Sequence, residues 1–418
     1  MNSRESRLNE WKIAPKNLEN NILETLKRQT NEEQYQYQLN EFEVGKLNKK
    51  TELEVGERIQ HESENKSSFY ENRIIHFDLK GAAPKIDYLK KVFKLIADAG
   101  ATGVLIEWED MFPYTGILKD SRSTQAYTLS ETEEILAYAN NLQLTTIPLV
   151  QTFGHLEWIL KSDKFMKYRE NEKFPQVICI GDEEGVGLVK EAIKQVIKVH
   201  EKYGVPFFHI GADEAFEFNV CKKDVEWAKN NSHIGSGKLA PFHISKIANY
   251  VISLIPGVRV LAWYDLLKTF SLSTVQEFKL DTLLEPVVWD YSESLIQQNA
   301  RSWTLLSHLF PTVWASSAFK GANTPSSQNL DLNHYMRNNQ QWILHKRLYG
   351  RLFKKNFQGI IITGWQRYDH FAVLCELLPV GLPSMIINLQ ASNVNIFIQR
   401  FSEIFSIHDV AICEYDMA

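Results

Sequence analysis

Eight short apolar runs, most of them followed by a helical pattern, constrain the fold of this chain more than any other feature. The runs are residues 74–79, 103–107, 144–150, 207–210, 259–263, 283–288, 312–315 and 359–363. Most are almost continuously apolar, as is typical of parallel strands that are buried on both faces. Strand and helix alternating eight times predict a (β/α)8 barrel, the TIM barrel of the α/β class. A doubly wound open sheet is the alternative, but no glycine-rich phosphate-binding turn favours it.

Helix signals separate most of these runs. Residues 87–99 carry apolar side chains at helical spacing and stop before Gly100, a residue type that commonly follows a helix C-terminus. The Ser-Glu-Thr-Glu stretch at residues 130–133 predicts a capping box that opens a helix to Asn141. Residues 188–202 form a third amphipathic stretch, which ends at Gly204.

The first seventy residues differ from the rest of the chain. They are charged, contain few aromatic residues and show no strand-like run, although residues 17–27 have apolar side chains at helical spacing. We interpret residues 1–70 as an N-terminal extension, helical or partly disordered. Residues 71–418 are then the barrel with C-terminal helices, which suits a chain of 418 residues.

The composition argues against several classes of protein. The net charge of −5 gives no sign of nucleic-acid binding, no stretch is long and apolar enough to span a membrane, and no secretory leader is visible. Cys179, Cys221, Cys375 and Cys413 are far apart and lack the spacing of metal ligands. We therefore expect free thiols in a reducing compartment, with no metal and no cofactor, and a cytoplasmic location.

Two adjacent carboxylates follow the fourth apolar run. Asp213 and Glu214 come directly after His209-Ile210-Gly211-Ala212, where Gly211 lets the backbone bend. In a (β/α)8 barrel this C-terminal end of a strand is where the active site lies. Like charges at close range resist joint ionisation, so we predict that at least one of the two has a raised pKa, which suits a general acid. An acidic loop, or a helix N-cap at Asp213, is the alternative.

Tryptophans gather at the same ends of five of the eight predicted strands. Flat rings cover the axial C–H face of a sugar, and carboxylates between them bind hydroxyls, so an aromatic-lined pocket is predicted. Packing in a large core is the alternative for any single tryptophan. The tryptophans are Trp108, Trp263, Trp289, Trp314 and Trp365, and the polar residues beside them include Glu109, Asp265, Asp290 and Tyr291.

The His-x-Gly-x-Asp-Glu pattern of residues 209–214 resembles the active-site signature of glycoside hydrolase family 20, the β-N-acetylhexosaminidases. Further segments resemble the hexosaminidase D branch of this family, namely residues 77–82, 151–157, 314–321 and 363–370. The resemblance runs from about residue 73 to about residue 383. It implies an exo-acting enzyme that removes terminal β-linked GalNAc or GlcNAc.

The resemblance also implies the roles of the two carboxylates. Glu214 would protonate the departing glycosidic oxygen and later activate water. Asp213 would hydrogen-bond the 2-acetamido N–H and stabilise an oxazolinium-like intermediate, while Tyr291 would bind the acetamido oxygen. A protein nucleophile would need a second carboxylate about 5–5.5 Å away across the sugar ring, which adjacent residues supply poorly. Family 20 is one of the substrate-assisted exceptions, in which the substrate supplies the nucleophile.

Other binding residues follow from the same resemblance. Trp263, Trp289 and Trp365 would enclose the acetyl group and the sugar face. Arg73, five residues before Asp78, would bind the 3- and 4-hydroxyls. The remaining substrate-binding candidates are His155, which would line the pocket and pair with Glu109, together with Asp265 and Trp314 at the ends of their strands.

One family pattern is missing. Much of the family has Trp-x-Glu after the eighth strand, and its glutamate holds the 4- and 6-hydroxyls. Here Trp365 is followed by Gln366 and Arg367. We take Asp369 or Glu376 as the candidate replacement, and expect galactosamine configuration to be tolerated or preferred.

Two other functions stay open at this point. One is a catalytically silent barrel that binds glycans, which the presence of both carboxylates disfavours. The other is a metal-dependent hydrolase using His155, His209, Asp213 and Glu214, which lacks the expected histidine spacing. The expected partner is a terminal N-acetylhexosamine glycoside, with no nucleic acid and no membrane. A homodimer is allowed, and the resemblance allows a nuclear location too.

Overall fold

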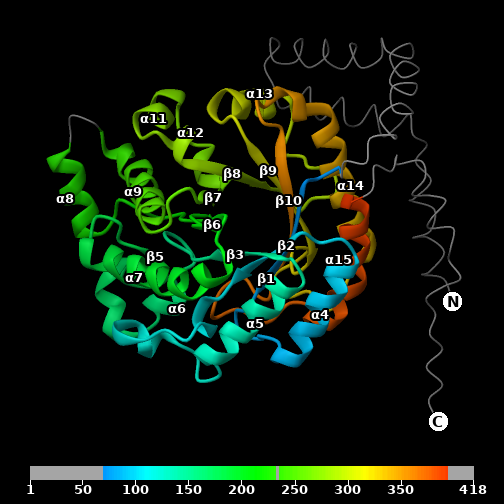
Figure 1. The fold of residues 1–418 in the computed structure, drawn as a ribbon. Helices are drawn as coiled ribbons and strands as arrows, with labels where there is room; N and C mark the ends of the chain where they lie inside the picture. Colours follow the sequence, from blue (N-terminus) through cyan, green and yellow to red (C-terminus); the bar gives the residue numbers. More distant parts are fainter. Residues whose placement is uncertain (1–68, 232–234, 394–418) are drawn as a thin grey trace, which may run out of the picture. The chain divides into compact units, whose positions relative to one another are not determined.

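The computed structural model describes residues 69–231 and 235–393, and within them eight parallel strands close into a barrel (Figure 1). The order around the barrel is β1-β10-β9-β8-β7-β6-β3-β2. The predicted (β/α)8 fold is therefore confirmed. The strands are β1 (Asn72–Asp78), β2 (Gly103–Glu107), β3 (Thr145–Leu149), β6 (Phe207–His209), β7 (Arg259–Trp263), β8 (Leu284–Trp289), β9 (Val313–Lys320) and β10 (Phe357–Gly364).

Helices surround the barrel, and a short antiparallel hairpin, β4 (Arg169–Asn171) with β5 (Phe174–Ile178), follows β3 (Figure 1). The longer helices are α4 (Ile86–Asp98), α5 (Leu129–Asn141), α7 (Glu183–His200), α8 (Lys222–Asn230), α9 (Leu239–Leu254), α13 (Ala300–Leu309), α14 (Leu332–Tyr349) and α15 (Leu378–Asn393). The short ones are α6 (Glu157–Leu160), α10 (Tyr264–Leu267), α11 (Leu272–Glu277) and α12 (Leu280–Leu283). No described helix is both long and apolar enough to cross a membrane.

Most predicted boundaries lie within two residues of those observed. One correction concerns α5, whose capping box is formed by Thr128 and Glu131. The Thr128 hydroxyl accepts from the Glu131 amide at 3.2 Å, and the Glu131 carboxylate accepts from the Thr128 amide at 2.7 Å. The second correction concerns β9, which continues to Lys320, five residues past the predicted end. This longer strand moves the C-terminal edge of the barrel away from Trp314.

The barrel interior is a packed apolar core that supports the site from below. Its members are Ile74, Leu105, Ile147, Leu149, Phe207, Leu261, Trp263, Val287, Trp314 and Ile361, with Trp289 and Trp365 packed against them. A larger core lies between the strands and the helices. At the N-terminal end of the strands, Arg259 donates two hydrogen bonds to Glu285, at 2.5 and 2.7 Å.

The cysteine prediction is wrong for two of the four residues. Cys179, directly after β5, and Cys221, the N-cap of α8, form a disulfide although 42 positions separate them in sequence. Folding brings them together because the start of α8 contacts β4 and the turn after β5: the Cys221 amide donates to Glu170 at 3.0 Å and the Gly181 amide donates to Asp224 at 2.6 Å. Cys375 is a buried free cysteine. Cys413, the chain after Asn393, and residues 1–68 of the extension predicted for residues 1–70, with its helix at 17–27, lie outside the described residues. Tyr70, at the end of that predicted extension, is buried in the core of the barrel unit.

Two glycines let the loops after β3 and β6 press against each other. A Cβ on Gly154 would lie 2.2 Å from the carbonyl oxygen of Asp213, and one on Gly211 would lie 1.9 Å from Oε1 of Gln151. Real Cβ atoms do not approach this closely. The contact therefore requires glycine at both positions.

We predict opposite stability changes for two alanine substitutions. Gly154→Ala forces the two loops apart and should lower the free energy of unfolding by about 1–3 kcal/mol. Gly187→Ala, at an exposed α7 position with no atom near the added Cβ, should raise it by about 0.5–1 kcal/mol. Urea denaturation of both variants tests this pair. Equal changes in the free energy of unfolding of the two variants would contradict the close contact between the loops at Gly154.

Candidate active site

A cavity of about 850 Å³, its open mouth included, lies at the C-terminal ends of the barrel strands. Loops after β3, β6, β7, β8, β9 and β10 contribute its lining. Seven of the predicted site residues line it, namely His155, Asp213, Glu214, Trp263, Trp289, Tyr291 and Trp365. The structure thus brings the aromatic rings and the two adjacent carboxylates to one pocket.

The turn that carries the two carboxylates has an unusual backbone. Gly211, Ala212 and Glu214 all have positive φ, at 63°, 66° and 46°. Left-handed conformations cost energy in residues that carry a Cβ, and they persist where neighbouring groups enforce them. Here the Gly211 amide donates to Nδ1 of His209 at 2.9 Å, and the Glu214 amide donates to Oδ2 of Asp265 at 2.9 Å. His209 is buried beneath Trp263 and so has a structural role.

His155 lies between the two carboxylates. Its Nε2 is 3.1 Å from Oε2 of Glu214 and 3.6 Å from Oδ2 of Asp213. Burial opposes protonation of His155, but the charge of Asp213 and the hydrogen bond to Glu214 outweigh it and raise its pKa to about 9. The histidine is therefore a cation at neutral pH, and it partly neutralises the acidic pair.

Asp213, the more buried of the two carboxylates, has a raised pKa. Burial raises the pKa of Asp213 to about 7, the charge of His155 works against this rise, and the charges of Asp265 and Glu214 add to it. Oδ1 of Asp213 is buried and has no hydrogen-bond partner among the described residues. This oxygen is available to accept a hydrogen bond from a ligand. The prediction that at least one of the pair has a raised pKa is confirmed at Asp213.

Four aromatic side chains form a connected wall. The Trp263 and Trp365 ring centroids lie 5.9 Å apart, and Trp289 stacks on Tyr291 at 5.5 Å. The Trp365 indole N–H donates to the Tyr291 hydroxyl at 3.1 Å. The Trp289 indole N–H donates to Oδ1 of Asp265 at 3.2 Å. Asp265 does not line the cavity, but it positions both Trp289 and the Glu214 backbone.

The structure places two predicted binding residues at the wrong end of the barrel. Arg73 is the second residue of β1, and its guanidinium donates to the carbonyls of Gly100 and Tyr70. Trp314 is fully buried near the start of β9, where its indole N–H donates to Glu285 at 2.7 Å. Both predictions are corrected, because each side chain belongs to the lower end of the barrel.

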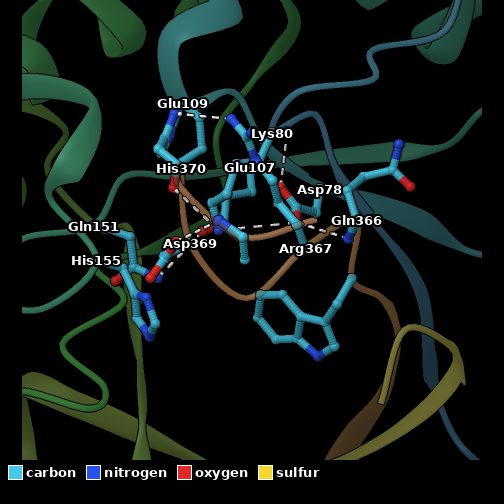
Figure 2. Close-up of polar contacts among 12 residues, drawn as sticks. Asp78, Lys80, Glu107, Glu109, Gln151, His155, Gln366, Arg367, Asp369 and His370 are labelled. Atoms are coloured by element: carbon cyan, nitrogen blue, oxygen red, sulfur yellow. Dashed lines mark hydrogen bonds and ion pairs between the residues drawn. The ribbon is translucent and has the colours of Figure 1, made fainter. Parts of the chain in front are cut away.

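Glu109 is also misassigned. It does not line the cavity and does not contact His155; instead Nε2 of His370 lies 2.9 Å from Oε2 of Glu109. Glu109 belongs to a buried charge cluster behind the pocket, in which Nζ of Lys80 lies 3.9 Å from Asp78 and 4.0 Å from Glu109 (Figure 2). Lys80 itself reaches the cavity lining.

Arg367, Tyr368, Gln151 and Lys80 also line the cavity, although none was predicted as a site residue. Arg367 lies over Gly81, whose missing side chain leaves room for the guanidinium, and Nη2 of Arg367 is 3.2 Å from Nδ1 of His370. The proposed replacements for the missing glutamate lie elsewhere. Asp369 accepts from backbone amides, and Glu376 accepts from the Gly321 amide and the Tyr335 hydroxyl. A basic residue therefore stands nearest to where the acidic one was expected.

A pocket walled by aromatic rings at the C-terminal end of a (β/α)8 barrel, with two carboxylates in it, defines the architecture of a glycoside hydrolase. The comparison with protein families agrees: residues 108–308 match the catalytic domain of glycosyl hydrolase family 20. Hexosaminidase D of Bos taurus is 37% identical over 354 residues, covering 81% of this chain and 99% of that protein. Hexosaminidase D of Homo sapiens is 40% identical over 329 residues, covering 78% of this chain and 66% of that protein.

The chain belongs to glycosyl hydrolase family 20, and it is a glycoside hydrolase of the β-N-acetylhexosaminidase class. Solved structures share its fold. The exo-β-N-acetylglucosaminidase of Vibrio harveyi has a TM-score of 0.59 at 13% identity, covering 81% of this chain and 57% of that one. The β-N-acetylhexosaminidase of Bacteroides fragilis has a TM-score of 0.58 at 14% identity, covering 81% and 70%.

Two arginine variants should separate stability from activity. Arg73→Met removes buried hydrogen bonds far from the cavity, so the free energy of unfolding should fall by about 1–3 kcal/mol while kcat/KM of the folded enzyme is kept. Arg367→Met removes a cation that lines the cavity, so kcat/KM for a nitrophenyl N-acetylhexosaminide should fall about 10- to 100-fold. Thermal melting of both variants measures the change in stability, and initial rates measure the change in kcat/KM. Loss of activity in folded Arg73→Met would restore the original assignment.

Proposed function

We propose that the protein is an exo-acting β-N-acetylhexosaminidase that hydrolyses terminal β-linked GalNAc or GlcNAc by a retaining, substrate-assisted mechanism. The observation that supports the proposal most strongly is the number and position of the carboxylates in the cavity. Among the described residues that line it, only Asp213 and Glu214 bear carboxylates, and they are neighbours on one turn. With no carboxylate on the opposite wall to act as nucleophile, the 2-acetamido group of the substrate takes that role.

Glu214 acts as the general acid. Its side chain is partly exposed, at 22%, on the open side of the turn, where it reaches a departing glycosidic oxygen. After the aglycone leaves, the same carboxylate takes a proton from the attacking water. His155, within 3.1 Å, orients it and balances its charge through both steps.

Asp213 acts on the acetamido group. Its buried Oδ1, which lacks a hydrogen-bond partner within the described part of the chain, accepts from the acetamido N–H. This bond turns the carbonyl oxygen toward C1 and stabilises the positive charge that develops on the ring as the oxazolinium-like intermediate forms. Tyr291 and the tryptophan wall hold the other side of the acetyl group.

Arg367 takes the place of the family glutamate in recognising the sugar hydroxyls. A guanidinium presents five N–H donors in a fork, so that different donors can bind a hydroxyl oxygen in an equatorial or in an axial position. Arg367 therefore places fewer geometric demands on the position of the 4-hydroxyl than a single fixed partner would. We therefore propose that both gluco- and galacto-configured substrates are accepted, and the ratio of kcat/KM for the paired nitrophenyl glycosides measures this.

Glu214→Gln should lower kcat by at least about 100-fold on a nitrophenyl glycoside, because general acid–base catalysis contributes about 10²–10⁴-fold. The loss should be larger on a disaccharide, whose poorer leaving group needs protonation more. Glu226→Gln, on the exposed surface of α8, is the matched control and should keep full activity. Unchanged turnover in Glu214→Gln would refute the assignment, and an inactive wild-type enzyme would favour the silent glycan-binding barrel.

The acid limb of the pH profile should report on Asp213. Its ionised form is the active one, so kcat/KM of the wild-type enzyme should rise with pH through about 7, the raised pKa of Asp213. His155→Gln removes the positive charge that lowers this pKa, and the acid limb should then move to higher pH. Initial rates across the pH range test the direction. An acid limb that moves to lower pH in His155→Gln would contradict the assignment of this limb to Asp213.

A further inference from the structure

A second cluster of ligand-type side chains lies outside the sugar pocket. Glu170 of β4, Cys179 after β5, Cys221 at the N-cap of α8 and Asp224 in its first turn each offer one ligand atom. All four atoms lie within 4.8 Å of one another. The four residues therefore converge from three separate segments of the chain.

The two carboxylates of this cluster are deeply buried and lack a cation. Glu170 is 3% exposed and Asp224 is fully buried. Within the described part of the chain, no lysine, arginine or histidine forms an ion pair with either residue, Oε2 of Glu170 is buried without a hydrogen-bond donor, and the two carboxyls interact with each other. Burying charge in this way is costly unless a proton or a metal ion compensates.

Backbone amides hold the carboxylates in place. Oε1 of Glu170 accepts from the Cys221 amide at 3.0 Å, and Oδ1 of Asp224 accepts from the Gly181 amide at 2.6 Å. A Cβ on Gly181 would lie 2.8 Å from that same Oδ1, so glycine is needed for the approach. A carboxylate has about four lone-pair sites, which leaves each group able to bind a metal as well. The oxygens are thus oriented before any ion arrives.

We propose that, when the Cys179–Cys221 disulfide is reduced, these two cysteines bind one Zn²⁺ together with Glu170 and Asp224. Zinc takes four ligands in a tetrahedron, with thiolate sulfur at about 2.3 Å and carboxylate oxygen at about 2.0–2.2 Å. Ligand atoms in such a site are separated by about 3.3–3.8 Å. The observed atoms all lie within 4.8 Å of one another, so the cluster is compact enough for one ion once reduction lets the two sulfurs move apart.

Conversion of the disulfide form into the zinc-bound form takes place in two steps, reduction and metal binding. A dithiol reductant gives two electrons and two protons to the disulfide, which yields two cysteine thiols and the oxidised reductant. Zn²⁺ then binds the two sulfurs as thiolates, and their two protons are released to solvent. Reoxidation removes both sulfur ligands and with them most of the affinity for zinc. The oxidised and the zinc-bound forms are therefore mutually exclusive.

Either form ties together the same two parts of the fold. Cys221 and Asp224 lie at the end of the segment that starts at the catalytic Glu214, while Glu170 and Cys179 belong to the β4–β5 hairpin and the turn after it. The zinc ion is thus a structural cross-link that replaces the disulfide in a reducing compartment. It takes no part in the hydrolytic reaction, whose pocket is lined by other residues.

The test uses the full-length protein, reduced with a dithiol, freed of metal by a chelator and desalted without oxygen. Zinc is then added, and bound metal is measured against a chromophoric chelator. We expect one zinc per chain, and Co²⁺ in its place should give the sulfur-to-cobalt charge-transfer absorption in the near ultraviolet. The oxidised protein should show neither.

Variants assign the ligands. Glu170→Gln and Asp224→Asn should each weaken zinc affinity at least 10-fold. Cys179→Ser should weaken both the affinity and the charge-transfer absorption, and Cys179→Ser combined with Cys221→Ser should abolish that absorption. Cys375→Ser and Cys413→Ser are the matched controls and should keep one zinc per chain. Circular dichroism verifies that each variant is folded. A reduced wild-type protein that binds no zinc overturns the proposal, as does binding that is equal in the oxidised protein or in Cys179→Ser.

Discussion

The site depends on the close approach of the loops after β3 and β6. The left-handed turn at Gly211, Ala212 and Glu214 exists because Gly154 lets the neighbouring loop touch the Asp213 backbone, and because Asp265 holds the Glu214 amide. This contact sets where both carboxylates point. It also brings His155, the residue after Gly154, between them, so that one backbone contact positions Asp213, Glu214 and the cationic His155.

A second set of contacts holds the far wall of the pocket. Nζ of Lys320, the last residue of β9, donates to the Trp365 carbonyl at 2.6 Å, and Gly321 leaves space for that carbonyl. Behind Trp365 stands His76, whose ring centroid is 4.6 Å from the indole and whose Nε2 is 3.0 Å from Oε2 of Glu107. The aromatic wall is therefore supported by buried polar groups. A rigid wall favours a mechanism that depends on holding a flexible acetamido group in one orientation.

Most of the fold and the centre of the site could be predicted from the sequence, because continuous apolar runs reveal buried parallel strands and active sites of such barrels lie at their C-terminal ends. Trp314 shows the limit of this reasoning. The polar Ser316 and Ser317 interrupt the apolar run, so the sequence pattern predicts a strand end at Ala315, whereas β9 continues to Lys320 and Trp314 lies near its start. The position of Arg367 in the cavity and the pairing of Cys179 with Cys221 result from tertiary packing between distant segments, which a local sequence pattern cannot predict. The Asp-Glu pair was found because its signal is local.

We propose that the substrate's acetamido oxygen is the nucleophile, because among the described residues the cavity holds no carboxylate besides the adjacent Asp213 and Glu214. The most direct measurement is kcat/KM for nitrophenyl glycosides whose N-acetyl group carries none, one, two or three fluorine atoms. Fluorine withdraws electrons from the carbonyl oxygen without enlarging the group greatly. If the acetamido oxygen is the nucleophile, kcat/KM should fall steeply with each added fluorine. Rates that stay level across the series would contradict it and point to a nucleophile supplied by the protein or by water.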